Sequence, residues 1–225
     1  MVEMFVKSLN KLDVWLEKNG WDGYDPYDIR GTKIFLYLQR NKYTNFGSGF
    51  LLNRHPMFFR RFFRVKKRVN AKAMALFARA YLNLYRKTRE ENWLKKALVC
   101  LNWLLENPSR GYSVFCWGYP FDWQSRVFIP KGTPSGVVTS VAAHAFLDAY
   151  EVLGEERYLR VAKGCCDFIL NSLNMDEVGN DEVCFSYTPI DDFHVHNANL
   201  FSASVLLRVM FVLRKINIKN WGLKL

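Results

Sequence analysis

The fold is decided by residues 78–107, ARAYLNLYRKTREENWLKKALVCLNWLLEN, because a later stretch of the same chain repeats them. Residues 143–172, AHAFLDAYEVLGEERYLRVAKGCCDFILNS, align with them without gaps at an offset of 65 residues. A repeat of this length indicates one supersecondary unit that is used more than once. The shared pairs include Ala78 and Ala143, Leu82 and Leu147, Tyr85 and Tyr150, Ala97 and Ala162, and Cys100 and Cys165.

Each copy has the pattern of a helical hairpin. In the first half, Ala78, Leu82 and Tyr85 are spaced i, i+4 and i+7, so they share one face of a helix. The second half has an apolar stripe of its own. The residues of that stripe in the first copy are Leu94, Ala97, Leu101 and Leu104.

The turn inside each hairpin is short. In the first copy, Thr88 and Glu91 have the spacing of a capping box. In the second copy, Gly154 can end the first helix in the left-handed conformation. We therefore predict hairpins at about 71–107 and 136–172, with almost no sheet.

A third copy of the first helix begins near residue 197, with Ala203, Leu207 and Met210 at the repeat positions. Its match ends after residue 213, so residues 211–225 form a divergent tail. At the other end of the chain, residues 2–18 resemble the second helix of a hairpin. We expect an all-α single domain over residues 1–225, with about three and a half antiparallel hairpins.

The helix predicted from about residue 197 is apolar on several sides. In the repeat pattern, no second hairpin helix follows it. End repeats of such arrays need polar caps, and a large apolar surface does not stay in water. We therefore expect an open arc whose apolar residues are exposed in the monomer, and which either self-associates through residues 200–213 or aggregates.

Composition narrows the classes of partner. The formal net charge of +11 in 225 residues favours an acidic partner. The sequence has neither zinc-finger spacing nor an RNP-like string, so we expect no nucleic acid partner. Five cysteines without CxxC spacing favour reduced, buried thiols in a cytoplasmic protein, and we expect no cofactor.

The links between hairpins are much longer than the turns inside them. They span about residues 19–30, 43–70, 108–135 and 173–196. In a layered array of antiparallel hairpins, all links of one kind lie on the same face. Long loops in compact domains are usually functional, so we expect the site on the face that carries these links.

Five stretches carry a resemblance to a known family: NGWDGYDPYDI, NAKAMALFARAYLNLY, CWGYPFDWQSR, TPSGVVTSVAAHAFLDAYE and DDFHVHNAN. Together they resemble a family of alpha/alpha-toroid proteins found with bacterial and archaeal polysaccharide-biosynthesis proteins. The resemblance covers the chain up to about residue 210, and the chain looks like the N-terminal half of such a toroid. It implies an architecture similar to six-hairpin glycosidases, polysaccharide lyases and sugar 2-epimerases, and it transfers no catalytic residue.

The run CWGYPFDWQSR, residues 116–126, is the first candidate site. Aromatic residues occupy every second position, and an extended backbone would place them on one side, with Asp122 and Gln124 on the other. Sugar rings stack on such aromatic rings, and Asp, Gln and Arg bind hydroxyl groups. The alternative is a rim segment whose rings pack on helix ends. The predicted sugar-binding residues here are Trp117, Tyr119, Trp123, Gln124 and Arg126.

The stretch DGYDPYDIRG near Pro26 is a second candidate. Its Asp side chains can cap the helix that follows, or the side chains of Tyr24, Asp25 and Asp28 can line a substrate cavity.

The stretch DDFHVHNAN, residues 191–199, is the third candidate. His194 and His196 share a side if the backbone is extended, and two aspartates precede them. Acid/base chemistry, half of a metal site, and capping of the last helix are all open readings. We expect no metal, because nothing fixes a third and a fourth ligand. The predicted catalytic residues are Asp122, Asp191, Asp192, His194 and His196, and Asn197 is a predicted substrate-binding residue.

Residues 53–69, NRHPMFFRRFFRVKKRV, hold seven Lys or Arg, four Phe and no acid. The segment is either a basic surface helix over core rings, a site for an anionic glycan or lipid-linked sugar, or a peripheral contact with the inner face of a membrane.

Two functions from different classes follow. The first is a carbohydrate-active enzyme of polysaccharide biosynthesis or modification that acts on an acidic saccharide, as a hydrolase, a lyase or an epimerase. A hydrolase needs two facing carboxylates, for which Asp122 and Asp191 or Asp192 are the best pair. A lyase or epimerase needs a base, for which His194 or His196 fits, and an Arg. The second is a non-catalytic glycan-binding or scaffold protein of an export assembly.

Overall fold

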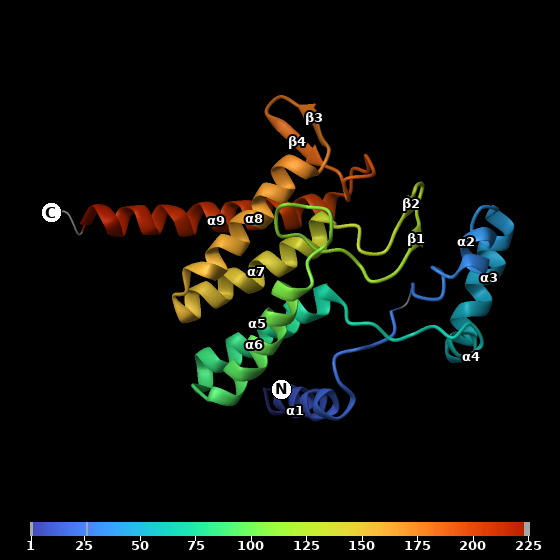
Figure 1. The fold of residues 1–225 in the computed structure, drawn as a ribbon, viewed down its shortest axis with the longest axis horizontal. Helices are drawn as coiled ribbons and strands as arrows, with labels where there is room; N and C mark the ends of the chain where they lie inside the picture. The colour runs from blue at the N-terminus through green and yellow to red at the C-terminus, as the bar shows by residue number, and fades with distance from the viewer. Residues whose placement is uncertain (1, 26, 223–225) are drawn as a thin grey trace. The chain divides into compact units, whose positions relative to one another are not determined.

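The computed structural model describes residues 2–25 and 27–222, and the chain separates into two compact units at Asn70 and Ala71 (Figure 1). The described helices of unit 1 are α1 (Val2–Asn19), α2 (Lys33–Leu38), α3 (Lys42–Arg54) and α4 (Pro56–Phe62). Unit 2 contains α5 (Ala71–Thr88), α6 (Glu91–Glu106), β1 (Trp123–Gln124), β2 (Phe128–Ile129), α7 (Gly136–Leu153), α8 (Glu156–Ser172), β3 (Met175–Gly179), β4 (Glu182–Phe185) and α9 (His196–Gly222). The single domain expected over residues 1–225 stays a prediction.

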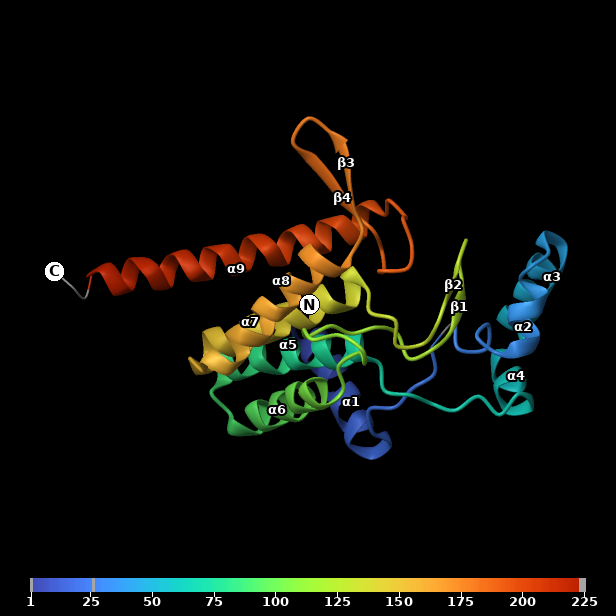
Figure 2. The ribbon, with the colours of Figure 1, turned by 45° about the horizontal axis from the view of Figure 1, so that its top comes forward.

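Both predicted hairpins of unit 2 are confirmed, as α5 with α6 and α7 with α8. The first helices form a row, because α7 packs against α5 on one side and α9 on the other. These three helices run in the same direction (Figures 1 and 2). Each of α6 and α8 packs against the first helix of its own hairpin. The protein is therefore mostly helical, as the repeat predicts.

The turns inside the hairpins differ from each other. Gly154 ends α7 with a φ of 71° and donates its amide to the Tyr150 carbonyl at 2.8 Å, which confirms the predicted left-handed stop. The predicted capping box at Thr88 is wrong. Thr88 is the last residue of α5, and its hydroxyl donates to the Leu84 carbonyl at 3.1 Å. Arg89 makes the turn instead, with a φ of 60°.

The repeat position shared by Leu82, Leu147 and Leu207 shows how α9 differs from α5 and α7. Leu82 and Leu147 are completely buried, whereas Leu207 is 52% exposed. In the described part of the chain, no second helix packs on this face of α9 as α6 and α8 do on α5 and α7. Leu200 and Phe211 are exposed as well, so the expected exposure of apolar residues on this helix is confirmed for these three.

The opposite face of α9 is covered. Val205 and Val209 are buried, and α9 packs against α7. Self-association through residues 200–213 stays a prediction.

The strands of unit 2 belong to the long links. The link before α7 forms the antiparallel pair β1–β2, and the link before α9 forms the antiparallel pair β3–β4. Among the residues that the structure describes, these are the two sheets, and each has two strands. Both links therefore fold into structures of their own.

Unit 1 has a small core of its own. Ile29, Phe35 and Leu52 are buried, and Phe59 of α4 and Phe63, the residue that follows α4, pack against them. The rings of Phe35 and Phe63 meet edge to face at 5.4 Å. Within the described ranges, no helix has the length and apolar character needed to cross a membrane.

The three repeat leucines allow a matched stability test. Leu147→Ala removes a buried side chain from a packed face, and we expect it to lower the free energy of unfolding by about 2–5 kcal/mol. Leu207→Ala makes the same chemical change at the exposed position, and we expect a loss below about 1 kcal/mol. Urea unfolding followed by circular dichroism measures both, and equal losses would contradict the packing of this repeat position.

Candidate functional site

Trp117 belongs to the core and does not line a cavity. Its side chain is 1% exposed, and its indole N–H donates to the Leu104 carbonyl at 3.0 Å. Its ring stacks on Phe146 of α7 at 5.9 Å. The predicted sugar-stacking role of Trp117 is therefore wrong, because the ring is needed to join the link to both hairpins.

The link between α6 and α7 folds back on itself, so that its backbone at Gly118 lies close to the residues just before α7. Gly118 makes an isolated bridge with Pro134, and a Cβ at this position would lie 2.0 Å from the Thr133 carbonyl oxygen. A side chain cannot fit there, so glycine allows the two backbone segments to approach. This contact fixes where the β1–β2 hairpin leaves the helical layer.

Asp122 and Gln124 stabilise the β1–β2 hairpin. The carboxylate of Asp122 accepts from the backbone N–H of Lys131 at 2.6 Å and so helps to close the base of the hairpin. The amide of Gln124 donates to the Ser125 carbonyl at 3.0 Å. The structure thus gives both predicted site residues local backbone partners.

Tyr119 and Trp123 form an aromatic cluster with Tyr187 of the next long link. The hydroxyl groups of Tyr119 and Tyr187 lie 3.3 Å apart, and the rings of Trp123 and Tyr187 meet edge to face at 5.7 Å. Tyr119 and Trp123 are both half-buried. This cluster holds the two long links of unit 2 together.

One cavity lies between these two links. Its volume is about 470 Å³, and its walls come from the turn between β1 and β2 and from the segment that precedes α9. Arg126 places its guanidinium over the ring of Phe193, 5.8 Å from the centroid. The structure therefore brings the predicted site residues Asp192 and His194 together with Arg126, which lies far from them in sequence. The lining residues are Ser125, Arg126, Asp192, Phe193, His194 and Val195.

His194 has a carboxylate partner that sequence reasoning missed. Its Nε2 lies 2.7 Å from Oδ2 of Asp176, which belongs to β3. A carboxylate that accepts from one ring nitrogen selects the tautomer and leaves the other nitrogen as an acceptor. Asp176 lies eighteen residues earlier in the sequence, on β3, and no local sequence pattern predicts how β3 pairs. The spacing of the two residues therefore could not identify Asp176 as the partner.

Asp191 is structural, unlike its neighbour Asp192. It is buried, and its carboxylate accepts from the backbone N–H groups of Tyr187, Thr188 and Phe193 and from the Thr188 hydroxyl. These bonds use its acceptor capacity to hold the link before α9 in its turn. The predicted catalytic role of Asp191 is therefore wrong, and Asp192 is the residue of the pair that reaches the cavity.

His196 and Asn197 lie in the first turn of α9, and both are exposed. Neither belongs to the residues that line the cavity. Of the two predicted histidines, His194 is therefore the one that the cavity includes.

Tyr24, Asp25 and Asp28 belong to unit 1, where they gather around Arg60. The Asp28 carboxylate pairs with the Arg60 guanidinium at 3.2 Å, and the same guanidinium donates to the Asp25 carbonyl at 2.9 Å and lies over the Tyr24 ring. Burial raises the pKa of Asp25. This part of the link thus has a local structural role, which is close to the capping alternative.

The cysteines and the acidic side chains give no sign of a metal centre. Among the described residues, no three His, Cys, Asp or Glu side chains gather as metal ligands would. All five thiols are free and buried, and burial raises the pKa of Cys100 and of Cys116 to about 12. The interpretation of Cys100 and Cys165 as core residues is confirmed.

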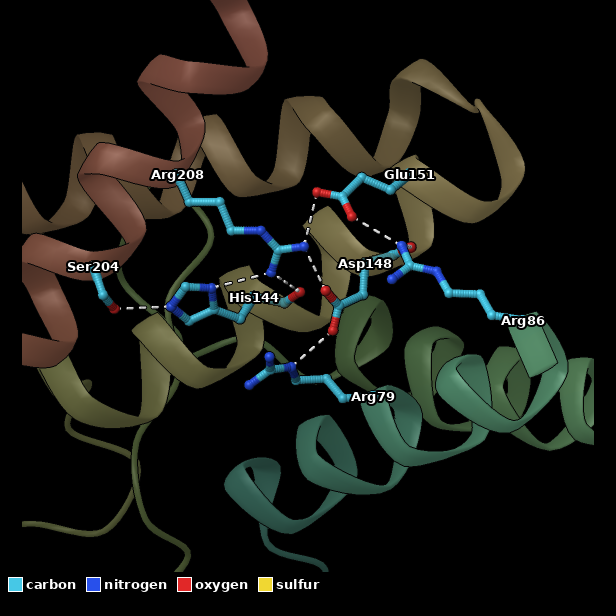
Figure 3. Close-up of polar contacts among 7 residues, drawn as sticks. All are labelled: Arg79, Arg86, His144, Asp148, Glu151, Ser204 and Arg208. Carbon is cyan, nitrogen blue, oxygen red and sulfur yellow. Dashed lines mark hydrogen bonds and ion pairs between the residues drawn. The ribbon is translucent and has the colours of Figure 1, made fainter.

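A second polar cluster, the helix-row cluster, joins α5, α7 and α9 (Figure 3). Asp148 is buried and accepts from Arg79 at 2.8 Å and from Arg208 at 2.5 Å. Glu151 accepts from Arg86 and Arg208, each at 2.9 Å. A buried carboxylate is costly unless it is paired, so these arginines make the polar position tolerable. The members are Arg79, Arg86, His144, Asp148, Glu151, Ser204 and Arg208.

The helix-row cluster follows the repeat. Arg79, His144 and Ser204 each come directly after the repeat alanine of their helix, and Asp148 and Arg208 each follow four residues later. His144 bonds Ser204 at 2.9 Å through Nε2. The sequence signal was therefore present, as a polar side chain at the same repeat position of all three helices.

The environment of His144 makes its imidazole a poor base. Burial, which is the largest cause, and the positive charges of Arg79 and Arg208 together lower its pKa to about 4, although the charge of Asp148 opposes them. His144 is therefore neutral near pH 7. We assign this cluster a structural role and the cavity near His194 the candidate functional one.

No model of a known protein family, no curated protein and no solved structure matches this chain. The resemblance to alpha/alpha-toroid proteins of polysaccharide biosynthesis therefore stays a prediction.

The lowered pKa of His144 predicts a pH effect on stability. Between about pH 6.5 and pH 4 the unfolded chain binds a proton at this residue and the folded chain does not, so lowering the pH favours unfolding. We expect His144→Gln to lose less stability than the wild type when the pH falls through this range. His55→Gln, at an exposed histidine, is the control and should follow the wild type.

Thermal unfolding across this pH range measures the difference between the variants. NMR titration gives a direct check, and a His144 midpoint near 6.5 would contradict the structural assignment.

Proposed function

We propose that this chain is a carbohydrate-active protein that binds a carboxylate-bearing saccharide in the cavity of unit 2. The observation that carries the proposal is that Arg126, Asp192 and His194 line one cavity of about 470 Å³. This volume suits a ligand of a few hundred cubic ångströms, the size of one or two sugar rings. Phe193 adds an apolar surface beside the polar groups.

Arg126 is the group suited to the substrate carboxylate. A guanidinium presents paired N–H donors that match the two oxygens of a carboxylate. The Phe193 ring lies under the Arg126 side chain and leaves the edges of the guanidinium for a ligand. Because Arg126 is exposed, a saccharide can reach it.

The reaction class that these groups support is proton abstraction next to a carboxylate. With Nε2 of His194 held by Asp176, Nδ1 is the nitrogen left to accept a proton. Negative charge then develops on the substrate carboxylate, where an arginine stabilises it. This first step is shared by polysaccharide lyases and by epimerases of uronic acids.

A hydrolase is less well supported. The predicted acid pair needs two facing carboxylates, but Asp122 closes the β1–β2 hairpin and Asp191 is buried in its turn. Of the residues that line the cavity, Asp192 is the one carboxylate. Proton abstraction by histidine therefore fits better than acid-assisted hydrolysis.

The arrangement of hairpins is part of the proposal. We infer that the row of α5, α7 and α9, with α6 and α8 outside it, corresponds to part of an alpha/alpha toroid. What supports this is the 65-residue repeat and the common direction of the three first helices. In such an array the long links gather at one end, where the cavity lies.

A second candidate function is glycan binding without turnover, as in a scaffold protein of an export assembly. The observation that favours it is that His194 and Asp176 are each about half exposed. An exposed histidine–aspartate pair can be a simple surface salt bridge, which needs no catalytic role.

The test separates these two functions. The full chain is titrated by calorimetry with an oligomer of hexuronic acid and with its neutral hexose counterpart. Arg126→Gln should weaken binding of the acidic oligomer about ten- to a hundredfold, because a charge-assisted contact is worth about 1.5–3 kcal/mol. Arg110→Gln, at an exposed arginine outside the cavity, is the control and should bind as the wild type does.

Proton abstraction is followed separately, as deuterium incorporation from D2O at the carbon next to the carboxylate for an epimerase, and as ultraviolet absorbance of the unsaturated uronate for a lyase. We expect one of these two signals with the wild type and neither with His194→Asn, while binding is retained. Binding that depends on Arg126 without either signal would support the non-catalytic function. Equal binding of the acidic and neutral oligomers would contradict both.

A further inference from the structure

The excess positive charge of the chain lies in one segment. Of the 32 Lys and Arg residues, 11 fall between residues 29 and 70, where there is no Asp or Glu. The remaining 21 equal the 21 Asp and Glu residues in number. The net charge of +11 is therefore a property of this part of unit 1 rather than of the whole protein.

The same segment exposes an aromatic stripe on α3. Tyr43, Phe46 and Phe50 are spaced i, i+3 and i+7, which places them on one face of the helix. They are 84%, 82% and 73% exposed. Single exposed apolar residues are ordinary on protein surfaces, but a contiguous stripe of large rings marks an interaction surface.

The sequence of α3 is also a poor helix former in water. Gly47 and Gly49 lie in its interior, where glycine disfavours the helix relative to alanine. Of the side chains of α3 that the structure describes, Leu52 is the one that joins the small core. A partner that covers the aromatic stripe would therefore stabilise the helix as well as remove the rings from water.

Helix α4 adds a second exposed apolar face. Phe59 and Phe63 point into the core of unit 1, whereas Phe58 and Phe62 stack on each other at 6.2 Å and are more than half exposed. Met57 is more than half exposed too. The helix thus has more apolar side chains than its core can cover.

Cationic side chains accompany these faces. Arg60 is paired with Asp28 in the interior of unit 1, but the other cationic side chains on α4 and just after it are exposed. The exposed cations from the end of α3 onward are Arg54, Arg61, Arg64, Lys66, Lys67 and Arg68.

We propose that residues 43–68 of unit 1 bind the surface of a lipid bilayer that contains anionic phospholipids. The rings of α3 and α4 would enter the boundary between headgroups and acyl chains, and the cations would contact lipid phosphates. Each Lys or Arg near an anionic surface adds to the attraction, and residues 43–68 hold no Asp or Glu that would offset it. The inference does not depend on the saccharide site of unit 2.

A lipid surface explains the side chains better than a nucleic acid does. Single-stranded nucleic acids use aromatic rings as stacking platforms for bases. Met57, and Ile34 of α2, are also more than half exposed, but neither side chain has an aromatic face on which a base could stack. Insertion into an apolar boundary uses aliphatic and aromatic side chains alike.

The first test measures binding of the full chain to phosphatidylcholine vesicles with and without phosphatidylserine, by co-sedimentation. We expect binding only to the anionic vesicles, and weaker binding at high salt. Phe46→Ser combined with Phe50→Ser should weaken binding at least tenfold, and Arg61→Gln combined with Arg64→Gln should weaken it several-fold. Leu170→Ser changes an exposed apolar residue of α8 and should bind as the wild type does.

A second measurement covers the case in which the serine variant does not fold. Phe46→Cys carries one exposed thiol beside five buried ones, so it can be labelled with a polarity-sensitive dye. The emission should shift to shorter wavelength when anionic vesicles are added.

Three results would overturn the inference. The first is unchanged emission of the dye together with equal binding to both kinds of vesicle. The second is tight binding of single-stranded RNA that depends on Phe46 and Phe50, without vesicle binding. The third is a chain that binds no vesicles but becomes monomeric when these two residues are changed, which would show that a second copy covers the stripe.

Discussion

The salt bridges of Asp148 to Arg79 and Arg208 determine how the rest of unit 2 is arranged. A buried carboxylate left without a partner would cost several kcal/mol, so α5, α7 and α9 must turn the correct faces toward one another. The level of the helices follows too. Asp148 lies twelve residues after the start of α7, and Arg208 lies twelve residues after the start of α9. At a rise of about 1.5 Å per residue, the two helices therefore begin at a similar level. The link that carries Arg126 and the link that carries His194 consequently enter at one end of the row, where they form the cavity.

The helical part of this arrangement could be predicted because the two copies of the repeat give independent information on which positions are buried. A residue type that returns at the same position in two copies is selected by the same neighbours, so Ala78 with Ala143 and Leu82 with Leu147 identified the buried stripe. The same logic failed at Thr88, where only one copy carried the signal and the side chain bonded the preceding turn instead. The polar repeat positions carry the same kind of information, because Asp148 stands out as a charged residue in a helix that is otherwise almost wholly buried.

The site was harder to predict because loop residues depend on contacts that sequence spacing does not contain. Alternation of rings in residues 116–126 predicts an extended segment with two sides, but it cannot tell which side faces the helices. Trp117 faces them, whereas Arg126, in the turn between β1 and β2, reaches the cavity. Adjacent Asp191 and Asp192 likewise have opposite environments, because a tight turn uses the first to accept backbone N–H groups. The partner of His194 comes from β3, and the pairing of that strand is not visible in any local pattern.

The net charge of the chain also depends on one region, so its location decides which ligand it favours. A net charge of +11 favours an acidic ligand in general, but its location in residues 29–70 means that it says nothing about the cavity. There, the cation Arg126 stands beside the carboxylate of Asp192, and Asp176 adds a second carboxylate next to His194, so the cavity holds no excess of positive charge. An acidic saccharide in unit 2 therefore has to be argued from the geometry of one guanidinium and one histidine. The overall charge is better explained by unit 1, whose exposed rings and cations occur in the same segment. The two surfaces thus rest on separate observations, and neither argument depends on how the units are placed.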